Sequence, residues 1–463
     1  MNRREWFKVS SAGVGAAGVG AAGLPLMAAA AQGQFPAPGG AGPQAAAQGH
    51  NLPPLRITDV RTILTAPARI RLVVVKVMTS EPGLYGLGCA TFTQRSRTVE
   101  TAIDKYLKPF LIGKDPLQIE DIYQSGFVSS YWRNGPVLGN ALSGVDMALW
   151  DILGKRAGLP VYQLFGGKCR EFAECYVHTS GANFQAAEKA ARDGMERGYR
   201  YIRTQVAVPG NATYGAGGGG GAQANMMTPA NSRTQTWEPG PYARIVPKLF
   251  EHLRKQLGDN VELLHDMHER VPPILAMQVC RDVEQYHPFF IEDPLSPEDV
   301  GYFEKIRALT STPIAMGELF NNPNEYVPLI ANRLIDFIRI HISQIGGLTM
   351  ARKVAQFCEF FAVRTAWHGP GDVSPVGHAA NVHLDLASPN FGIQEGRVFN
   401  QAEQDVFPGC PVLRQGSFTV SDRPGLGIDL NEELARKFPI TDDPPFDFNW
   451  GNLRRRDGGI VKP

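Results

Sequence analysis

The spacing of hydrophobic positions changes along the chain, and the first spacing is that of a small mixed domain. Arg56–Thr65 and Ile70–Met78 are rich in β-branched residues and are separated by a short turn sequence, which predicts an antiparallel hairpin. Thr98–Leu111 and Leu138–Lys155 carry apolar residues at helical spacing. Strands followed by helices predict an α+β domain over residues 53–165.

After Gly166-Gly167 the pattern becomes an alternation of short apolar strands and helical segments. Eight strands in about 225 residues match the size of a (β/α)₈ barrel, expected over residues 166–406 and capped by the α+β domain. One connection, Pro209–Pro241, is long and glycine-rich, which is typical of a lid or an insertion. Residues 407–463 are expected to return to the cap and complete it. The expected strands are Phe172–Val177, Tyr201–Val206, Val261–Leu264, Phe289–Ile291, Ile314–Ala315, Phe337–Ile340, Val363–Ala366 and Phe391–Ile393.

The N-terminal segment predicts export. The pair Arg3-Arg4 precedes an apolar run of alanine and glycine, Ala12–Ala31, that ends in small residues. This order resembles a twin-arginine signal peptide over residues 1–31, followed by a linker over residues 32–52. We therefore expect the twin-arginine export machinery to carry the folded precursor to a bacterial periplasm. The alternative is an untargeted tail rich in alanine and glycine.

Charge and cysteine content exclude several classes of function. Forty-six basic residues against 45 acidic ones give a formal net charge of +1, which removes the electrostatic case for a nucleic-acid partner. Six cysteines in 463 residues, without a Cys-x-x-Cys pair, disfavour a disulfide scaffold and a thiolate zinc site. Beyond the N-terminal segment no stretch has about 18 consecutive apolar residues, so no membrane-spanning helix is expected.

Three acidic residues follow successive expected strands at equal spacing. Asp266, Glu292 and Glu318 are each 26 residues apart, about one strand–helix unit, so they are expected at the same level of three neighbouring strands. Active sites of such barrels lie at the carboxyl ends of the strands. Hard oxygen ligands on one side of an open site suit Mg²⁺. A single acid after a strand is more often the N-cap of the next helix, but the equal register of three favours metal ligands.

The other strand ends carry groups suited to acid–base chemistry and binding. Arg203 lies on the second strand and Tyr214 follows it by eleven residues; a neighbouring arginine lowers the pKa of a phenol and makes it a usable base. From spacing alone, Tyr214 fits an ordinary loop aromatic as well. His265, His378 and His383 are expected to be structural. The remaining candidates are His178, His268, His368, Asp372 and Glu395.

The motifs around these residues resemble those of one family. They are Ile202-Arg203-x-Gln205, Leu264-His265-Asp266-Met267-His268, Ile291-Glu292-Asp293-Pro294, Gly317-Glu318 and His368-Gly369-Pro370, in barrel order. Together they resemble the enolase superfamily, of the mandelate racemase/muconate lactonizing enzyme type. Within it they resemble the mannonate dehydratase-like group, over roughly residues 55–463.

The resemblance implies a Mg²⁺-dependent dehydratase of a sugar acid, D-mannonate or D-gluconate, that gives a 2-keto-3-deoxy sugar acid. It implies that Tyr214, assisted by Arg203, removes the proton next to the carboxylate, and that His268 protonates the departing 3-hydroxyl. It also implies a homo-oligomer. The implied metal ligands are Asp266, Glu292 and Glu318, and the implied substrate-positioning residues are His178, His368, Asp372 and Glu395.

Several positions depart from the pattern of that family. Thr93 stands where the capping loop is expected to offer an asparagine to the substrate, Pro370 follows His-Gly where alanine is usual, and Gly396 stands where an aromatic residue is common. His341 ends the sixth strand and is expected to lack the His–Asp partnership of the superfamily's racemases. Two alternatives therefore stay open. One is an acid-sugar epimerase or racemase with His368 as its second base. The other is a metal-binding but catalytically weak protein that binds sugar acids or has a regulatory function.

Overall fold

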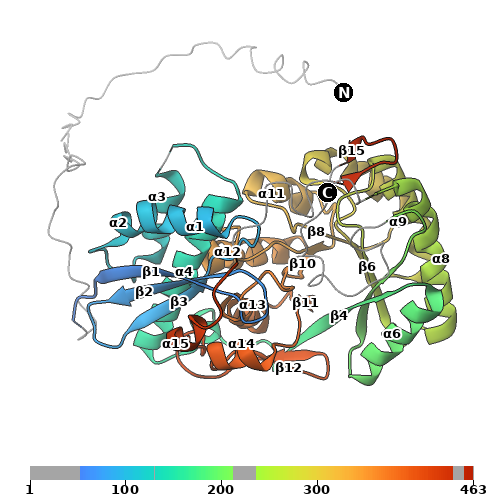
Figure 1. Ribbon diagram of the computed structural model, residues 1–463. Helices are drawn as coiled ribbons and strands as arrows, with labels where there is room; N and C mark the ends of the chain where they lie inside the picture. Colours follow the sequence, from blue (N-terminus) through green and yellow to red (C-terminus); the bar gives the residue numbers. More distant parts are fainter. Residues whose placement is uncertain (1–52, 130, 212–235, 442–452, 462–463) are drawn as a thin grey trace, which may run out of the picture. The chain divides into compact units, whose positions relative to one another are not determined.

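The computed structural model describes residues 53–129, 131–211, 236–441 and 453–461, and within them the chain opens with an antiparallel sheet in the order β1-β2-β3. The predicted hairpin is confirmed as β1 (Ile57–Thr65) and β2 (Leu72–Thr79). Helices pack beside this sheet (Figure 1). They are α1 (Ser96–Ala102), the π-turn η1 (Ile103–Leu107), α2 (Lys108–Leu111), α3 (Ile119–Val128), α4 (Pro136–Ala157) and α5 (Val161–Leu164).

The third strand of the cap, β3 (Tyr85–Cys89), escapes prediction because it contains two glycines. Both glycines face α4 at very short range. A Cβ at Gly86 would lie 1.9 Å from the Ala148 carbonyl oxygen, and one at Gly88 would lie 1.8 Å from the Gly144 carbonyl oxygen. The weak strand propensity is thus the cost of letting the helix lie directly on the strand.

The helix expected over Thr98–Leu111 is interrupted. It is divided into α1, the π-turn η1 and α2. Pro109 stands in the first turn of α2, where its missing N–H would otherwise donate to a carbonyl one turn earlier. The helical spacing of the apolar residues is therefore kept while the hydrogen-bond ladder is interrupted.

The predicted fold class, a parallel (β/α) barrel with an α+β cap, is confirmed. The described barrel strands run parallel in the order β4-β5-β6-β7-β8-β9-β10, and β11 pairs with β4. Phe391 bridges Thr365 and so joins β10 to the segment before β11, which closes the ring. The strands are β4 (Ala173–Gly181), β5 (Tyr201–Val206), β6 (Glu262–Asp266), β7 (Phe290–Glu292), β8 (Ile314–Met316), β9 (Phe337–Ile338), β10 (Arg364–Thr365) and β11 (Gln394–Glu395).

The eighth strand lies later than expected. Phe391–Ile393 was expected as the strand, whereas β11 begins at Gln394 and Phe391 contributes a single bridge. A Cβ at Gly392 would lie 2.7 Å from Phe337 and from the Thr365 carbonyl oxygen, so the chain passes too close to its neighbours there for a longer regular pairing.

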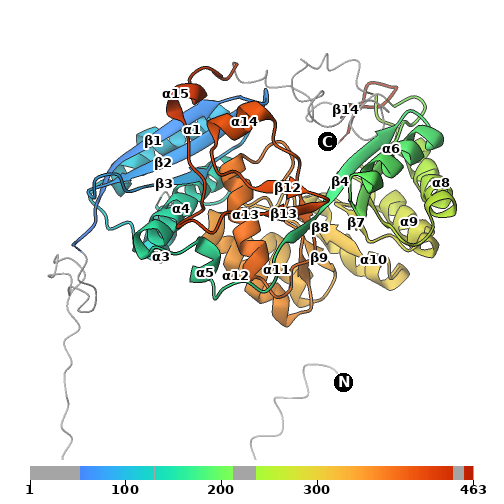
Figure 2. The same ribbon diagram turned by 90° about the horizontal axis from the view of Figure 1, so that it is seen from below.

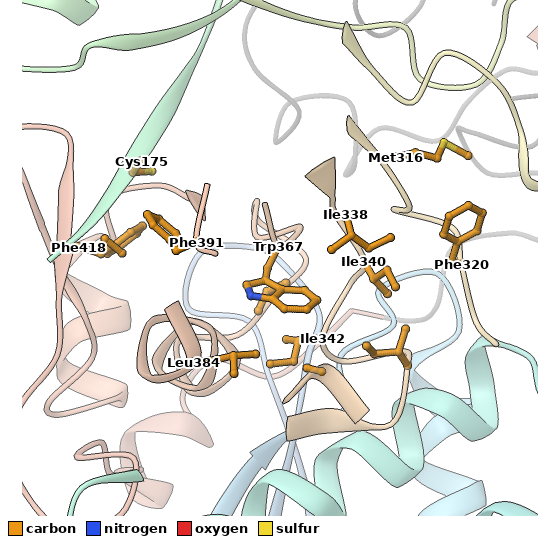
Figure 3. Packing of buried hydrophobic residues seen from close by; sticks show 14 of the residues in the cluster. Cys175, Met316, Phe320, Ile338, Ile340, Ile342, Trp367, Leu384, Phe391 and Phe418 are labelled. Atoms are coloured by element: carbon orange, nitrogen blue, oxygen red, sulfur yellow. The ribbon is translucent and has the colours of Figure 1, made fainter. Parts of the chain in front are cut away.

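Helices cover the outside of the barrel (Figure 1). Their inner faces form one core with the outward-facing strand residues; Figure 3 shows Trp367 in this core near Ile340, Ile342 and Leu384. The helices are α6 (Phe184–Glu196), α8 (Pro239–Leu257), α9 (Pro273–Val283), the 3₁₀ turns η2 (Glu284–Tyr286) and η3 (Pro297–Tyr302), α10 (Phe303–Leu309), α11 (Pro323–Ala331), α12 (Gly347–Phe360), α13 (Pro375–Ala387) and α14 (Gln401–Val406). None of the described helices combines the length and apolar composition needed to cross a membrane.

The C-terminal segment contacts both parts of the fold. It contains β12 (Val412–Arg414), β13 (Ser417–Thr419), α15 (Glu432–Ala435), β14 (Leu453–Arg454) and β15 (Ile460–Val461). Strand β13 pairs antiparallel with β4 of the barrel, and α15 packs beside β1 of the cap (Figure 2). Lys76 on the cap lies 2.6 Å from Glu432. The last described piece differs from the expected return to the cap, because the Arg454 carbonyl accepts a 2.8 Å hydrogen bond from the Trp237 N–H beside α8.

Candidate active site at the barrel mouth

One layer of side chains inside the barrel sets the position of the site. A cluster inside the ring takes one apolar residue from each barrel strand or its flank: Tyr176, Tyr201, Leu264, Phe290, Ala315, Phe337, Ala366 and Ile393. Alternate residues of a strand point to the same face, so the residue two places further on must also point inward, one level closer to the carboxyl end. Those residues are His178, Arg203, Asp266, Glu292, Gly317, Arg339, His368 and Glu395.

This layer brings the predicted acids together around arginines. The Arg203 Nη1 atom lies 3.1 Å from Asp266 Oδ2 and 2.8 Å from Glu292 Oε1. Glu318 follows the glycine of the layer and lies 2.8 Å from Arg339 Nη1. Each of these acids is buried or nearly so, so a charge-balanced arrangement is required.

Arg339 is the residue of this cluster that the sequence analysis missed. Its guanidinium is fully buried and contacts four carboxylates. Besides Glu318, these are Glu292 at 2.9 Å, Glu395 at 2.5 Å, and Asp293. The signal that would have found it is register: Arg339 stands two residues after Phe337, as Glu292 stands two after Phe290.

The cluster contains more carboxylates than guanidinium groups, and this excess of acids affects the pKa values of the carboxylates. Burial raises the pKa of Glu292 well above its ordinary value and that of Asp293 to about 7, although Arg339 opposes both shifts. Burial would also raise the pKa of Glu318, but His368, His268 and Arg339 outweigh it and hold that pKa well below its ordinary value. A further cation beside Glu292 would lower the cost of ionising it.

The donor set fits a divalent cation that prefers oxygen. Oxygens of Glu292, Asp293 and Glu318 lie within 4.8 Å of one another. Asp293 stands in this group although Asp266 was the predicted ligand. Asp293 accepts a 2.8 Å hydrogen bond from the Gly317 N–H and pairs with Arg339, while its own φ is 40°. This turn of the chain brings the Asp293 carboxylate to Gly317 and Arg339, whereas Asp266 lies in the inward layer with Glu292.

His178 has a defined proton position. Its Nδ1 atom lies 3.0 Å from Arg203 Nη2, and a guanidinium only donates, so Nδ1 accepts. The proton then sits on Nε2, which lies 2.7 Å from Glu395 Oε1. Burial and the charge of Arg203 lower the pKa of His178, in keeping with a neutral ring. The ring of His178 therefore links the two residues, with Arg203 at its Nδ1 atom and Glu395 at its Nε2 atom.

His268 lies at the edge of the cluster on a strained turn. Its φ is 53°, in the left-handed region, and its backbone N–H donates a 2.7 Å hydrogen bond to Asp266 Oδ1. Its Nε2 atom lies 3.5 Å from Glu318 Oε1. Strained backbone of this kind gathers at functional sites, where it aims a side chain that a regular strand would point elsewhere.

At the neighbouring strand ends, after β9 and β10, the structure corrects one expectation. His341 was expected to lack an aspartate partner, yet its Nε2 atom lies 3.6 Å from Asp372 Oδ2. The other oxygen of Asp372 lies 3.9 Å from His368 Nδ1, and His368 Nε2 lies 3.4 Å from Glu318. The partnership escaped the sequence analysis because Asp372 comes from the loop after the seventh strand, not from the strand that carries His341.

Two of the predicted site residues need separate mention. Tyr214 lies outside the described residues, and Thr93 is not brought into this cluster. Thr93 is buried in the cap, and its hydroxyl hydrogen-bonds Gln94 Oε1 at 2.9 Å; within the described part of the chain no hydrogen bond links it to the cluster. Gly396 has a packing explanation, since a Cβ there would lie 2.3 Å from Phe418 of the C-terminal hairpin.

The histidines expected to be structural lie away from the cluster. His265 points outward, where its Nε2 and the hydroxyl of Tyr242 on α8 are 2.6 Å apart and its Nδ1 lies 2.7 Å from the Thr204 carbonyl oxygen. His378 and His383 are buried in α13, and burial lowers their pKa values to about 3 and about 4. Neutral, packed rings agree with a structural role.

Comparison with protein families assigns this architecture to a class. Residues 50–166 match the mandelate racemase / muconate lactonizing enzyme N-terminal domain, and residues 186–434 match the enolase C-terminal domain-like family. A closed parallel barrel with such a cap and acids at its strand ends is that of an enolase-superfamily protein. Within that superfamily, this chain belongs to the D-galactonate dehydratase family.

Its relatives support this assignment along most of the chain. The D-galactonate dehydratase family member RspA of Pantoea ananatis is 56% identical over 422 residues, which is 88% of this chain and 99% of the relative. A second member, Dd703_0947 of Musicola paradisiaca, is 54% identical over the same shares of the two chains.

A solved structure gives the fold and a ligand set for comparison. It is described as an enolase from Pantoea ananatis with bound D-gluconate and Mg; it is 54% identical, has a TM-score of 0.81 and covers 88% of this chain and 100% of its own. The predicted cofactor, Mg²⁺, is thus the metal in that relative. These comparisons assign the chain to the D-galactonate dehydratase family and stop short of the mannonate dehydratase-like group within the superfamily.

Proposed function

We propose that this protein is a Mg²⁺-dependent dehydratase of a sugar acid, D-mannonate or D-gluconate, with 2-keto-3-deoxygluconate as the product. The observation that carries the proposal is the inward layer in which Asp266 and Glu292 meet Arg203, Arg339 and Glu395, with Glu318 beside them. The D-gluconate and Mg of the Pantoea ananatis structure support the same substrate class.

Asp266, Glu292 and Glu318 would hold the metal. When bound, Mg²⁺ would supply the positive charge that stabilises the negative charge developing on the substrate carboxylate as the C2 proton leaves. Arg203 holds two of these acids through one nitrogen and so keeps their spacing. Arg339 neutralises the remainder of the buried acid layer and keeps it compact.

Proton transfer is assigned to Tyr214, Arg203 and His268. The family resemblance assigns removal of the C2 proton to Tyr214, with Arg203 as the charge that would lower the pKa of its phenol. His268, at the rim beside Glu318, gives a proton to the 3-hydroxyl, which leaves as water. The resulting enol takes a solvent proton at C3 and releases the proton of its 2-hydroxyl to solvent, which gives the 2-keto-3-deoxy acid; the proton taken by Tyr214 and the one given by His268 are exchanged with water, so the overall change is loss of one water.

Binding of the remaining substrate atoms is assigned to the rim. His178 and Glu395 stand beside Arg203, and His368 and Asp372 follow at the neighbouring strand end; we assign these four residues to positioning hydroxyls and the carboxylate. Thr93 would contribute from the cap. The His368–Asp372 pair also favours the second candidate, an epimerase or racemase that returns a proton to C2 from the opposite face.

The test incubates the full chain and Mg²⁺ with a panel of aldonic and uronic acids, and semicarbazide detects 2-keto acids. We expect product from one or two acids, abolished by EDTA and by Tyr214→Phe. Tyr302→Phe, a change of a surface tyrosine on η3, is the matched control and should be unaffected. A blank panel with intact Mg²⁺ binding contradicts the dehydratase and favours the binding or regulatory protein.

We also propose that residues 1–31 direct export through the twin-arginine machinery to the periplasm. The support is the order of Arg3-Arg4, the apolar run and the small residues at its end. Replacing both arginines with lysine should leave the protein in the cytoplasmic fraction, while the unchanged chain is recovered from the periplasm. Equal distribution of the two proteins contradicts the proposal.

A homo-oligomer remains a prediction from the family resemblance. Light scattering of the purified full chain measures its molar mass directly. A mass equal to one chain contradicts the prediction.

A further inference from the structure

His341 has no role in the proposed reaction, yet it lies at the barrel mouth. It follows β9, is 4% exposed, and its ring centroid lies 4.9 Å from that of His368. Together with Asp372 these two histidines form a cluster of three groups, which adjoins the acid layer where His368 Nε2 lies 3.4 Å from Glu318. Asp372 approaches both rings, with Oδ2 lying 3.6 Å from His341 Nε2 and Oδ1 lying 3.9 Å from His368 Nδ1.

The hydrogen bonds around His341 assign its proton. The Ser343 backbone N–H lies 3.1 Å from His341 Nδ1. A backbone N–H only donates, so Nδ1 carries a lone pair and the proton of the neutral ring sits on Nε2. Nε2 is the atom that faces Asp372, so His341 offers the aspartate a donor.

The second carboxylate oxygen of Asp372, Oδ1, can still accept a hydrogen bond. Its Oδ1 atom and His368 Nδ1 are buried without a hydrogen-bond partner in the described structure, and they face each other. Catalytic hydrogen bonds are often long before substrate binds and tighten in the complex. A donor at His341 leaves Oδ1 of Asp372 free to orient His368.

The cap holds the two loops that carry this cluster. Cys89, the last residue of β3, has its Sγ atom 3.0 Å from the Ser343 hydroxyl and 3.4 Å from the Ser374 N–H. Ser343 follows His341 and Ser374 follows Asp372, each by two residues. The end of one cap strand therefore fixes the spacing between His341 and Asp372.

We propose that His341 is a positioning residue: its Nε2–H holds Asp372, and Asp372 in turn orients His368 toward the substrate. The proposal rests on the proposed function for its kinetic consequence, although the contact itself does not. His341 acts through Asp372 and touches no reacting atom. A purely structural role, limited to the loop that accepts from Ser343, is the competing explanation.

Two substitutions separate these explanations. In His341→Gln the amide nitrogen reaches about as far as Nε2 and keeps a donor toward Asp372, while in His341→Asn the shorter amide keeps an acceptor for Ser343 but falls short of the aspartate. With the full chain, Mg²⁺ and the sugar acid that it turns over, we expect kcat/KM to fall about 10- to 100-fold in His341→Asn and less than about threefold in His341→Gln. His252→Asn, a change of a half-buried histidine on α8, is the control.

The kinetic result overturns the proposal in two ways. If His341→Asn keeps full activity, or if both variants lose the same activity, the donor to Asp372 has no positioning role. If the losses follow the melting temperatures of the variants, the role is structural. The expected result is the Gln–Asn difference at equal thermal stability.

A second readout does not depend on turnover. Long-range ¹H–¹⁵N spectra of the histidine-labelled full chain report which ring nitrogen carries the proton, and the His341 signal is the one missing from His341→Asn. We expect the Nε2–H form at neutral pH and a changed signal in Asp372→Asn. A proton on Nδ1, or a signal indifferent to Asp372→Asn, overturns the proposal. If no sugar acid is turned over, the proposed function fails, and these spectra alone test the contact between His341 and Asp372.

Discussion

The two halves of the barrel mouth are held in different ways. In the acidic half, Asp266, Glu292 and Glu318 are fixed by strand register and by two buried arginines that each contact more than one carboxylate. In the histidine half, His341, Asp372 and His368 are joined by single contacts of 3.6 and 3.9 Å, and their loops depend on the cap.

This difference separates two requirements of the proposed chemistry. A metal site needs several ligands at fixed spacing, which barrel strands provide without help from elsewhere. In the histidine half, His341 and His368 extend β9 and β10 and pair as a single β-bridge, whereas Asp372 lies on the loop after β10. Cys89 of the cap contacts the segments that follow His341 and Asp372, so this half depends on residues far away in the sequence and is the half that can adapt to a substrate. We therefore expect changes in the acidic half to remove metal binding, and changes in the histidine half to spare it.

The largest expected effect is at the centre of the acidic half. Glu292→Gln removes a charge from the predicted ligand set, so we expect Mg²⁺ affinity to fall and dehydration to slow by about 10³-fold. Calorimetric Mg²⁺ titration and initial rates measure the two effects. Glu304→Gln, on the exposed side of α10, should match the unchanged chain; retained Mg²⁺ affinity in Glu292→Gln would break the comparison.

Arg339 should carry stability as well as geometry. Arg339→Met removes the cation that Glu292, Glu318 and Glu395 share, which leaves Arg203 alone to balance the buried acids, and breaking a buried ion pair in this way costs about 3 kcal/mol or more. Urea denaturation of the metal-free protein measures the loss. The exposed pair Arg281–Asp282 provides the control, because Arg281→Met should cost less than about 1 kcal/mol. Equal losses would show that burial of the acidic half is unimportant.

Asp372→Asn tests the histidine half. The amide cannot accept from His341 and His368 as a carboxylate does, so we expect kcat/KM to fall about 10- to 100-fold. Mg²⁺ affinity should remain, because the nearest predicted ligand, Glu318, keeps its contacts with Arg339 and His268. Rate and calorimetric measurements on the same variant test both expectations. Loss of Mg²⁺ binding in Asp372→Asn would show that metal binding also depends on the histidine half.

The smallest effect concerns the support from the cap. Asp146 on α4 accepts the Thr349 N–H at 2.9 Å and so caps α12, the helix that follows the His341 loop. Burial raises its pKa from 3.8 to about 7, although the Thr349 hydrogen bonds oppose the shift. The folded state therefore binds this proton more tightly, and the associated stability is present below pH 3.8 and is lost as the pH rises through about 7.

In Asp146→Asn this contribution disappears. The free energy of unfolding of the variant should improve relative to the unchanged chain by about 1 kcal/mol or more between pH 4 and pH 8. Denaturation at a series of pH values measures the difference. A difference that is flat with pH, or that grows in the opposite direction, contradicts the account of this cap contact.

The barrel and its acid layer were predictable because they follow from local periodicity. The equal spacing of Asp266, Glu292 and Glu318 places them on successive strands, and the structure has them at the ends of β6, β7 and just after β8. The two-residue period of a strand also points Arg339 into the barrel. A single arginine two residues after Phe337 could not be recognised as a site residue until the inward-facing positions of each strand were known.

Other features could not be read from the chain alone. The contact between His341 and Asp372 depends on how the loop after β10 folds over the mouth, and the strand β3 depends on α4 lying against Gly86 and Gly88. These are tertiary contacts between distant segments, and neither the propensity nor the spacing of either segment contains them.

The most direct test of the central claim is proton NMR of the full chain with Mg²⁺ in D₂O, with D-gluconate and D-mannonate as separate substrates. If the protein is a dehydratase, we expect a 2-keto-3-deoxy product with one deuterium at C3, formed only with Mg²⁺ and lost in Tyr214→Phe. Deuterium at C2 of recovered sugar acid without product would contradict dehydration and favour the epimerase. Neither product nor exchange, with Mg²⁺ bound, would contradict both and leave a binding protein.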